Sequence, residues 1–148
     1  MPHDRAERVA RHTADDVNET IERQIEHSIR WHEANPEHID ARLRELDREW
    51  DIERVLETNA SSLALAGVVL GATVHRRWLA LPALVTGFLF QHAVQGWCPP
   101  LPVLRRLGYR TAREIAAERY ALKALRGDFD LPADTADHAA AALAAVQR

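Results

Sequence analysis

The only cysteine of the 148 residues, Cys98, is the side chain best suited to nucleophilic chemistry. It stands just after a long apolar run and shortly before Arg105 and Arg106. Nearby cations lower the pKa of a thiol, whereas a helix carboxyl end raises it, so the sequence leaves its activation open. Cys98 is therefore either a redox, acylation or sulfur-relay group, or a small apolar residue packed where the chain reverses.

A second group of polar side chains lies inside the apolar region. His92 stands between Gln91 and Gln95. Ionisable groups surrounded by apolar sequence are usually functional or paired. The cluster is therefore a candidate binding site on a proton or solute pathway, which would require an oligomer. The alternative is a neutral histidine that is hydrogen-bonded to Asn59, Ser61 or Ser62 of a neighbouring helix.

The remaining motifs for catalysis and metal binding are missing from the sequence. A single cysteine excludes an internal disulfide and any multi-cysteine metal site. The other histidines show neither H-x-x-x-H nor E-x-x-H spacing: His3, His12, His27, His32, His38, His75 and His138. Glycine-rich phosphate loops are also missing. We therefore predict no metal and no cofactor, and consider an enzyme less expected than a structural protein.

Two uncharged runs dominate the middle of the chain. No charged residue occurs from Thr58 to Val74, and none from Trp78 to Leu104. As helices, the first run and residues 78–97 would be roughly 25 and 30 Å long, close to the roughly 30 Å of a bilayer's hydrocarbon core. We therefore predict an all-α protein in which region 55–104 is a transmembrane hairpin of two helices, about 56–74 and 78–98.

Small residues recur at positions that would face each other in this hairpin. With the turn at Arg76–Arg77, the expected helix-packing pairs are Gly71 with Ala83 and Gly67 with Gly87. Farther from the turn, Ser62 would meet Gln91, and Asn59 would meet Gln95. Small residues let membrane helices approach closely, and opposed polar groups can bond to each other. Gly67 and Gly71 could instead form the face of a homodimer.

Charged, helix-forming segments flank the hairpin. Region 1–54 is predicted to hold two helices broken at Asn35–Pro36, the first with an apolar stripe of Val17, Ile21, Ile25 and Ile29. Region 105–148 is predicted to hold a basic amphipathic helix, from a capping box at Thr111–Glu114 to about Arg126, and an alanine-rich tail. These helices would dock on a partner, lie on anionic lipid headgroups, or remain solvated.

The distribution of basic residues predicts the orientation. Seven basic residues follow the second run between 105 and 126, four arginines precede the first run between 42 and 54, and the turn holds two. Cytoplasmic ends of membrane helices carry the excess of Lys and Arg. Both termini are therefore expected in the cytoplasm. The segment before the first run is too charged to be a secretory signal.

One element after the second run resembles a known family. Gly96-Trp97-Cys98-Pro99, followed by Leu104-Arg105-Arg106-Leu107-Gly108 after two short apolar helices, is similar to the YgaP-like transmembrane domain, a bacterial family of membrane hairpins of unknown function. The resemblance covers about residues 52–108. It implies a paired-helix anchor that dimerises in the bacterial inner membrane. Some members carry a rhodanese domain, which this chain lacks, so the resemblance implies no sulfurtransferase activity.

Together these patterns predict an integral membrane protein that acts as an anchor or scaffold. The expected partners are membrane lipid, further copies of the chain and a cytoplasmic protein. Nucleic acid is not expected, because the basic residues adjoin the hairpin and lipid is the nearer polyanion. The alternatives are a sulfur or redox relay at Cys98 and an oligomeric solute or proton pathway at His92.

Overall fold

The computed structural model describes residues 7–129, and this part of the chain is helical, without strands. The all-α class is thereby confirmed. In chain order the elements are α1 (Glu7–Arg11), α2 (Asp15–Ala34), η1 (Pro36–His38), α3 (Ile39–Arg48), α4 (Ile52–Thr73), η2 (Arg76–Leu79), α5 (Ala80–Gln95), α6 (Leu101–Arg106) and α7 (Ala112–Arg126), where η marks a 3-10 helix.

The described residues form two compact units, each built from two separated stretches of the chain. Unit 1 contains residues 7–22 and 50–113, and unit 2 contains residues 23–49 and 114–129. The two units differ from the three regions predicted from the sequence, which are 1–54, 55–104 and 105–148. The regions before and after the hairpin each contribute residues to both units. Residues 130–148, the predicted alanine-rich tail, lie outside the described residues.

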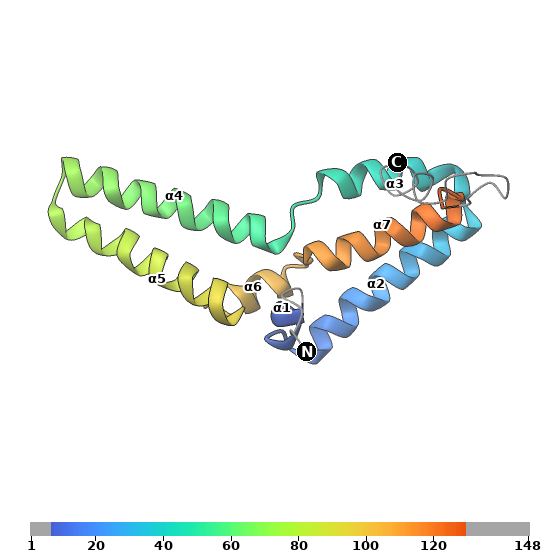
Figure 1. The fold of residues 1–148 in the computed structure, drawn as a ribbon, viewed down its shortest axis with the longest axis horizontal. Helices are drawn as coiled ribbons and strands as arrows, with labels where there is room; N and C mark the ends of the chain where they lie inside the picture. The colour runs from blue at the N-terminus through green and yellow to red at the C-terminus, as the bar shows by residue number, and fades with distance from the viewer. Residues whose placement is uncertain (1–6, 130–148) are drawn as a thin grey trace, which may run out of the picture. The chain divides into compact units, whose positions relative to one another are not determined.

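In unit 1, α4 and α5 pack against each other as antiparallel neighbours joined by η2 (Figure 1). The Oδ1 atom of Asp51 caps α4 by accepting a hydrogen bond from the Arg54 N–H at 2.7 Å. At the turn, Nδ1 of His75 accepts from the Arg77 N–H at 3.0 Å and caps η2. α4 starts four residues before the predicted boundary, and α5, with 16 residues, is shorter than predicted.

The contact between α4 and α5 has a different register from the one predicted. A Cβ atom on Gly67 would lie 2.5 Å from Cδ of Pro82, and one on Gly71 would lie 2.6 Å from Cδ2 of Leu79. A Cβ atom on Gly87 would meet nothing within 4 Å, so the expected pairing of Gly67 with Gly87 is wrong. α4 ends at Thr73 and η2 begins at Arg76, so the chain turns at Val74–His75 and not at Arg76–Arg77, which brings Leu79 and Pro82 opposite the glycines.

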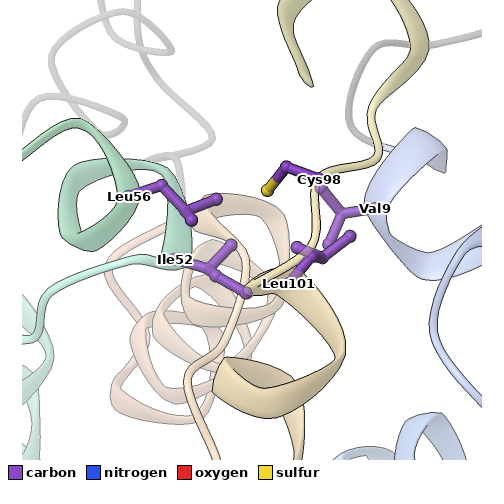
Figure 2. Close-up of a cluster of buried hydrophobic side chains, with 5 residues drawn as sticks. All are labelled: Val9, Ile52, Leu56, Cys98 and Leu101. Atoms are coloured by element: carbon purple, nitrogen blue, oxygen red, sulfur yellow. The ribbon is translucent and has the colours of Figure 1, made fainter. Parts of the chain in front are cut away.

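The core of unit 1 lies at the open end of this helix pair. Figure 2 shows the buried cluster, in which α1, α4, α6 and the loop after α5 each contribute at least one side chain: Val9, Ile52, Leu56, Cys98 and Leu101. Trp97 and Leu104 pack against the cluster. The backbone N–H of Ile52 donates to the Arg110 carbonyl at 2.9 Å. These contacts hold the start of α4 beside α6.

Arg105 is buried in unit 1, with 1% of its surface exposed. Its Nε donates to Oγ1 of Thr13 at 3.1 Å, and its Nη2 donates to Oδ1 of Asn18 at 2.9 Å. Its Nη1 donates to the Tyr109 carbonyl at 3.2 Å. Arg105 therefore ties α6 to the N-terminal stretch of unit 1, whereas its neighbour Arg106 is exposed.

In unit 2, α3 and α7 share a buried apolar cluster made of Ile39, Leu43, Leu46, Ile115 and Leu122. Beside it lies the fully buried carboxylate of Glu118, on α7. Nε of Arg42 donates to this carboxylate at 2.9 Å, and Oγ of Ser28 donates to it at 2.5 Å. One side chain of α7 is thus bonded to both α2 and α3.

Two basic residues of α7, Arg119 and Arg126, have partners within unit 2. Arg119 pairs with Asp47 at 3.1 Å and donates to the Leu46 carbonyl, while Arg126 pairs with Asp40 and Asp128. These ion pairs favour the interpretation in which α7 packs against α3 over the one in which its basic face binds lipid. α7 begins directly after Thr111 and ends before Gly127, in agreement with the predicted boundaries.

The predicted break at Asn35–Pro36 is confirmed, but the prediction of two helices in region 1–54 is wrong, because this region contains α1, α2, η1, α3 and the first residues of α4. α2 ends at Ala34, and Pro36 starts η1. Asn35 makes no side-chain capping bond to η1. Its Nδ2 instead donates backward to the Trp31 carbonyl at 2.7 Å. Proline at the first helical position is then the feature that starts the new helix.

Within residues 7–129, one helical segment, Pro36–Thr73, is long and apolar enough to cross a membrane. Only 17% of its most apolar 18-residue window is buried, whereas the core helix of a soluble protein is mostly buried. α5 has 16 residues and is therefore shorter than this 18-residue window. The helix pair and its turn nevertheless expose large apolar side chains, each more than two fifths accessible: Leu63, Leu65, Val68, Val69, Val74, Leu79, Leu84, Phe88, Phe90 and Val94.

Candidate functional site

A pocket of about 440 Å³ lies in unit 1 between α4, α5 and the start of α6. We call it the hairpin pocket. It is lined by Leu56, Asn59, Ala60, Leu63, Val85, Phe88, Leu89, His92, Cys98, Pro99, Pro100 and Leu104. Only Asn59, His92 and Cys98 bring polar side-chain atoms. An apolar pocket with a few polar groups is the usual form of a small-molecule site, so the hairpin pocket is the candidate site.

Gly96 positions Cys98 in the wall of this pocket. Its φ of 77° is left-handed, a conformation that glycine adopts without strain, and its N–H donates to the His92 carbonyl at 2.7 Å. α5 ends there, and the chain turns through Cys98 into α6. Figure 2 shows the sulfur of Cys98 directed toward Leu56, which also lines the pocket. The thiol thus belongs to both the core and the pocket, with 3% exposure.

The surroundings of Cys98 do not activate it. Burial raises the pKa of the Cys98 thiol, and a hydrogen bond from the backbone of Leu101 opposes this only in part. Thiolate, the nucleophilic form, is therefore scarce at neutral pH. The guanidinium of Arg105 is directed to Thr13, Asn18 and Tyr109. The geometry thus favours the packed, apolar interpretation of Cys98 over a thiol relay.

The structure splits the polar cluster expected around His92. His92 lines the hairpin pocket, and its Nδ1 atom is buried. Gln91 instead lines a separate shallow depression of α5, together with Ala80, Ala83, Leu84, Gly87 and Phe88. Nε2 of Gln91 donates a hydrogen bond to Oε1 of Gln95 at 3.4 Å, one turn away on the same helix. His92 therefore shares a site with Cys98 and not with the glutamines, although the sequence suggested two separate sites.

The polar residues of α4 also bond within their own helix. Nδ2 of Asn59 donates to the Val55 carbonyl at 3.0 Å. The hydroxyls of Ser61 and Ser62 donate to the Thr58 carbonyl at 3.1 and 2.7 Å. These bonds take the place of the cross-helix pairs expected for Asn59 and Ser62. Short polar side chains in a helix often donate a hydrogen bond to the backbone carbonyl three or four residues earlier.

Sequence reasoning did not identify most of the pocket wall. On α4 the lining residues Leu56, Ala60 and Leu63 follow the spacing of one helix face, and on α5 Val85, Leu89 and His92 do the same. This matching periodicity was the available signal. It was hidden because both helices are apolar all round, so no face stands out.

The motif behind the family resemblance has mainly structural functions here. Gly96 ends α5, Trp97 packs on the core, and Gly108, with φ of 90°, follows the end of α6. Cys98 and Pro99 line the hairpin pocket. Of the two arginines in the motif, Arg105 makes the buried contacts.

Unit 2 has a more polar pocket of about 540 Å³. It is lined by His27, Ser28, Trp31, His32, His38, Ala41, Arg42 and Glu45. Arg42 already pairs with Glu118 and with Glu45. Nδ1 of His32 lies 2.7 Å from the Ser28 carbonyl. Among residues 7–129, no three His, Cys, Asp or Glu side chains are placed to hold a metal ion.

Comparisons of the chain with protein-family models, with curated proteins and with solved structures found no match. The resemblance to the YgaP-like family stays a prediction that rests on residues 52–108.

Proposed function

We propose that the protein is a small integral membrane protein in which α4 and α5 cross the bilayer as a hairpin and anchor a cytoplasmic helical unit. The observation that carries this proposal is the exposed apolar surface of the helix pair. An apolar surface of this extent is unfavourable in water and suits a lipid environment. The anchored unit 2, with its paired charges, would then serve as a scaffold for a cytoplasmic partner.

The hydrogen bonding of the helix pair suits lipid surroundings. In hydrocarbon, polar groups must be satisfied within the protein. Asn59, Ser61, Ser62 and Thr73 all donate to carbonyls of their own helix. No charged residue lies between Thr58 and Val74 or between Trp78 and Leu104. The pair could thus enter a bilayer without leaving a charge in its apolar core.

The lengths and the flanking residues suit two crossings. α5 alone would be about 24 Å long, and Trp78 and Leu79 of η2 add roughly 4 Å, which together approach the roughly 30 Å of the hydrocarbon layer. Arg76 and Arg77 are exposed at the turn. Trp50 is exposed near the start of α4, with the guanidinium of Arg54 4.3 Å from its ring centroid. Aromatic and basic residues at both ends are typical of membrane interfaces.

Fractionation of cells that express the full chain tests the anchor. We expect the protein to stay in the membrane pellet after alkaline carbonate washing and to dissolve only with detergent. A monomer that stays clear in plain buffer would contradict the proposal. A Leu65→Asp/Val69→Asp double variant should shift toward the soluble fraction, because it places charges on the exposed apolar face. An Arg44→Asp variant on the exposed surface of unit 2 is the control and should fractionate unchanged.

Cysteine labelling tests the orientation with both termini in the cytoplasm. In a Cys98→Ser background, Val74→Cys places a thiol at the turn and Arg44→Cys places one in unit 2. A membrane-impermeant maleimide should label Val74→Cys in intact bacterial cells, and Arg44→Cys only after permeabilisation. Labelling of both positions from outside, or of neither, would contradict two crossings.

We further propose that the anchor self-associates through the outer face of α5. Gly67 and Gly71 lie against Pro82 and Leu79 within the helix pair, which makes them poorly suited to a dimer contact. Gly87 remains open and lies in a shallow depression with Ala80 and Ala83. Small residues permit close helix approach in membranes. Gly87→Leu should reduce crosslinked dimers severalfold, whereas Ala66→Leu on an exposed part of α4 should not, and equal crosslinking in both would reject this interface.

A further inference from the structure

The hairpin pocket has the chemistry of a site for an apolar chain. Nine of its twelve lining residues have purely hydrocarbon side chains, and they come from α4, α5 and the turn into α6. Its volume of about 440 Å³ lies within the range of small-molecule sites, about 300–1,000 Å³. An apolar occupant would cover surface that is otherwise unfavourable in contact with water.

Two of the three polar side chains in the wall, those of Asn59 and Cys98, do not demand a charged ligand. Nδ2 of Asn59 already donates to the Val55 carbonyl. The Cys98 thiol is protonated at neutral pH, because burial raises its pKa. No Lys, Arg, Asp or Glu lines the pocket. An ionic headgroup would therefore lose its hydration without gaining a counter-charge there, so the fit is to hydrocarbon.

The wall near Cys98 is fixed before any ligand binds. Pro99 and Pro100 restrict the backbone, and Cys98 packs on Ile52 and Leu101 in the core of unit 1. A preformed site loses less conformational entropy on binding than a mobile surface. The fixed wall distinguishes the pocket from the remaining exposed surface of α4 and α5, where lipid chains would exchange freely.

We propose that the hairpin pocket holds one acyl chain of a membrane lipid, between α4 and α5 and against the turn that carries Cys98. This inference rests on the proposed membrane location, because a bilayer supplies straight hydrocarbon chains in excess. The lipid would act as a fixed structural ligand at the base of the hairpin.

Cys98 provides the readout, since it is the only cysteine and lines the pocket. Alkyl methanethiosulfonates form a mixed disulfide with a thiolate and release methanesulfinate. Full-length protein in neutral detergent would be treated with methyl, butyl and octyl reagents. A Cys98→Ser, Val69→Cys variant, with its thiol on the exposed apolar surface, measures how far each reagent partitions into the micelle. The rate at Cys98 relative to that at Val69→Cys should rise at least tenfold from the methyl to the octyl reagent.

Two matched variants test whether the pocket causes this preference. Ala60→Phe fills the pocket, and Ala66→Phe adds the same volume on the exposed surface of α4, outside the pocket. Ala60→Phe should abolish the tenfold rise and lose a lipid that native mass spectrometry detects on the wild type, whereas Ala66→Phe should keep both. If Ala60→Phe loses helical circular dichroism, Ala60→Val serves as the milder filling variant.

The outcomes separate this inference from the proposed function. A membrane-bound protein whose relative rate does not change with chain length, and which retains no lipid, would overturn the acyl-chain site and leave the anchor standing. A protein found in the soluble fraction that still prefers octyl reagents would overturn both the anchor and the lipid source. A membrane-bound protein with the chain-length preference and a retained lipid supports the proposal.

Discussion

The guanidinium of Arg42 on α3 holds the carboxylate of Glu118 on α7 through two hydrogen bonds. Nε lies 2.9 Å from Oε1, and Nη2 lies 3.3 Å from Oε2. The two residues are 76 positions apart, and the Glu118 side chain is fully buried. A buried carboxylate is costly unless it is paired and hydrogen-bonded. This pair, with Ser28 as a second donor, determines how the three helices of unit 2 meet.

Arg42→Met should destabilise unit 2 by about 3 kcal/mol, because it leaves the carboxylate of Glu118 buried without its cation. The midpoint of urea unfolding, followed by circular dichroism in detergent, measures the loss. Arg44→Met is the control, since Arg44 is exposed on the same helix, and it should change the stability by less than about 0.5 kcal/mol. Similar losses in both variants would show that the pair is not important for stability.

Arg105→Lys should destabilise unit 1 by about 2 kcal/mol or more, although the charge is kept. A lysine has no planar fork and cannot reproduce the separate bonds of Arg105 to Thr13, Asn18 and Tyr109. Arg106→Lys, at the exposed neighbouring position, should have almost no effect. Thermal unfolding measures both variants, and equal melting temperatures would contradict the structural importance of Arg105.

Gly67→Leu should weaken the packing of α4 on α5 by about 1–3 kcal/mol, as overpacked contacts do. The added side chain would begin 2.5 Å from Cδ of Pro82, in a ring that cannot rotate away. Gly87→Leu should leave the stability of the monomer unchanged, because the space there is open. Unfolding in detergent, monitored at a protein concentration without dimers, compares the two. A larger loss for Gly87→Leu would favour the register predicted from the sequence.

Alkaline pH should destabilise unit 1 through Cys98. Burial raises the pKa of the Cys98 thiol, so the unfolded chain loses this proton at a lower pH than the folded one. The stabilising contribution is fully present below the ordinary thiol pKa and is lost as the pH rises through the raised folded value. Cys98→Ala should flatten this part of the pH profile of the melting temperature. An equal alkaline decline in the variant would assign the effect to other groups.

The positions of the helices could be predicted largely from local signals. Pro36 marks the start of η1, Gly127 follows the end of α7, and each charge-free run contains most of one helix of the pair. These signals act through backbone geometry and solvation within a few residues, so they can be read from a short window of sequence.

Other predictions failed because they depended on an assumed geometry. The facing pairs of the hairpin assumed a turn at Arg76–Arg77, but the chain turns at Val74–His75, between the end of α4 and the start of η2. This places Pro82 and Leu79 against the glycines. The polar pairs across the hairpin failed for a related reason. An amide or hydroxyl can bond to its own helix, as Asn59 and Ser62 do, without any partner.

By itself, the sequence determined an all-helical chain with two apolar segments, the helix break at Asn35–Pro36 and the scarcity of catalytic motifs. Only the tertiary structure decided that Arg105 is buried while Arg106 is exposed, that Glu118 meets Arg42, and that His92 and Cys98 line one pocket. The physical reason is the distance along the chain over which each interaction acts. Helix propensity and capping act over a few neighbouring residues, whereas burial and ion pairing depend on which distant segments come together, and the same residue types suit several arrangements.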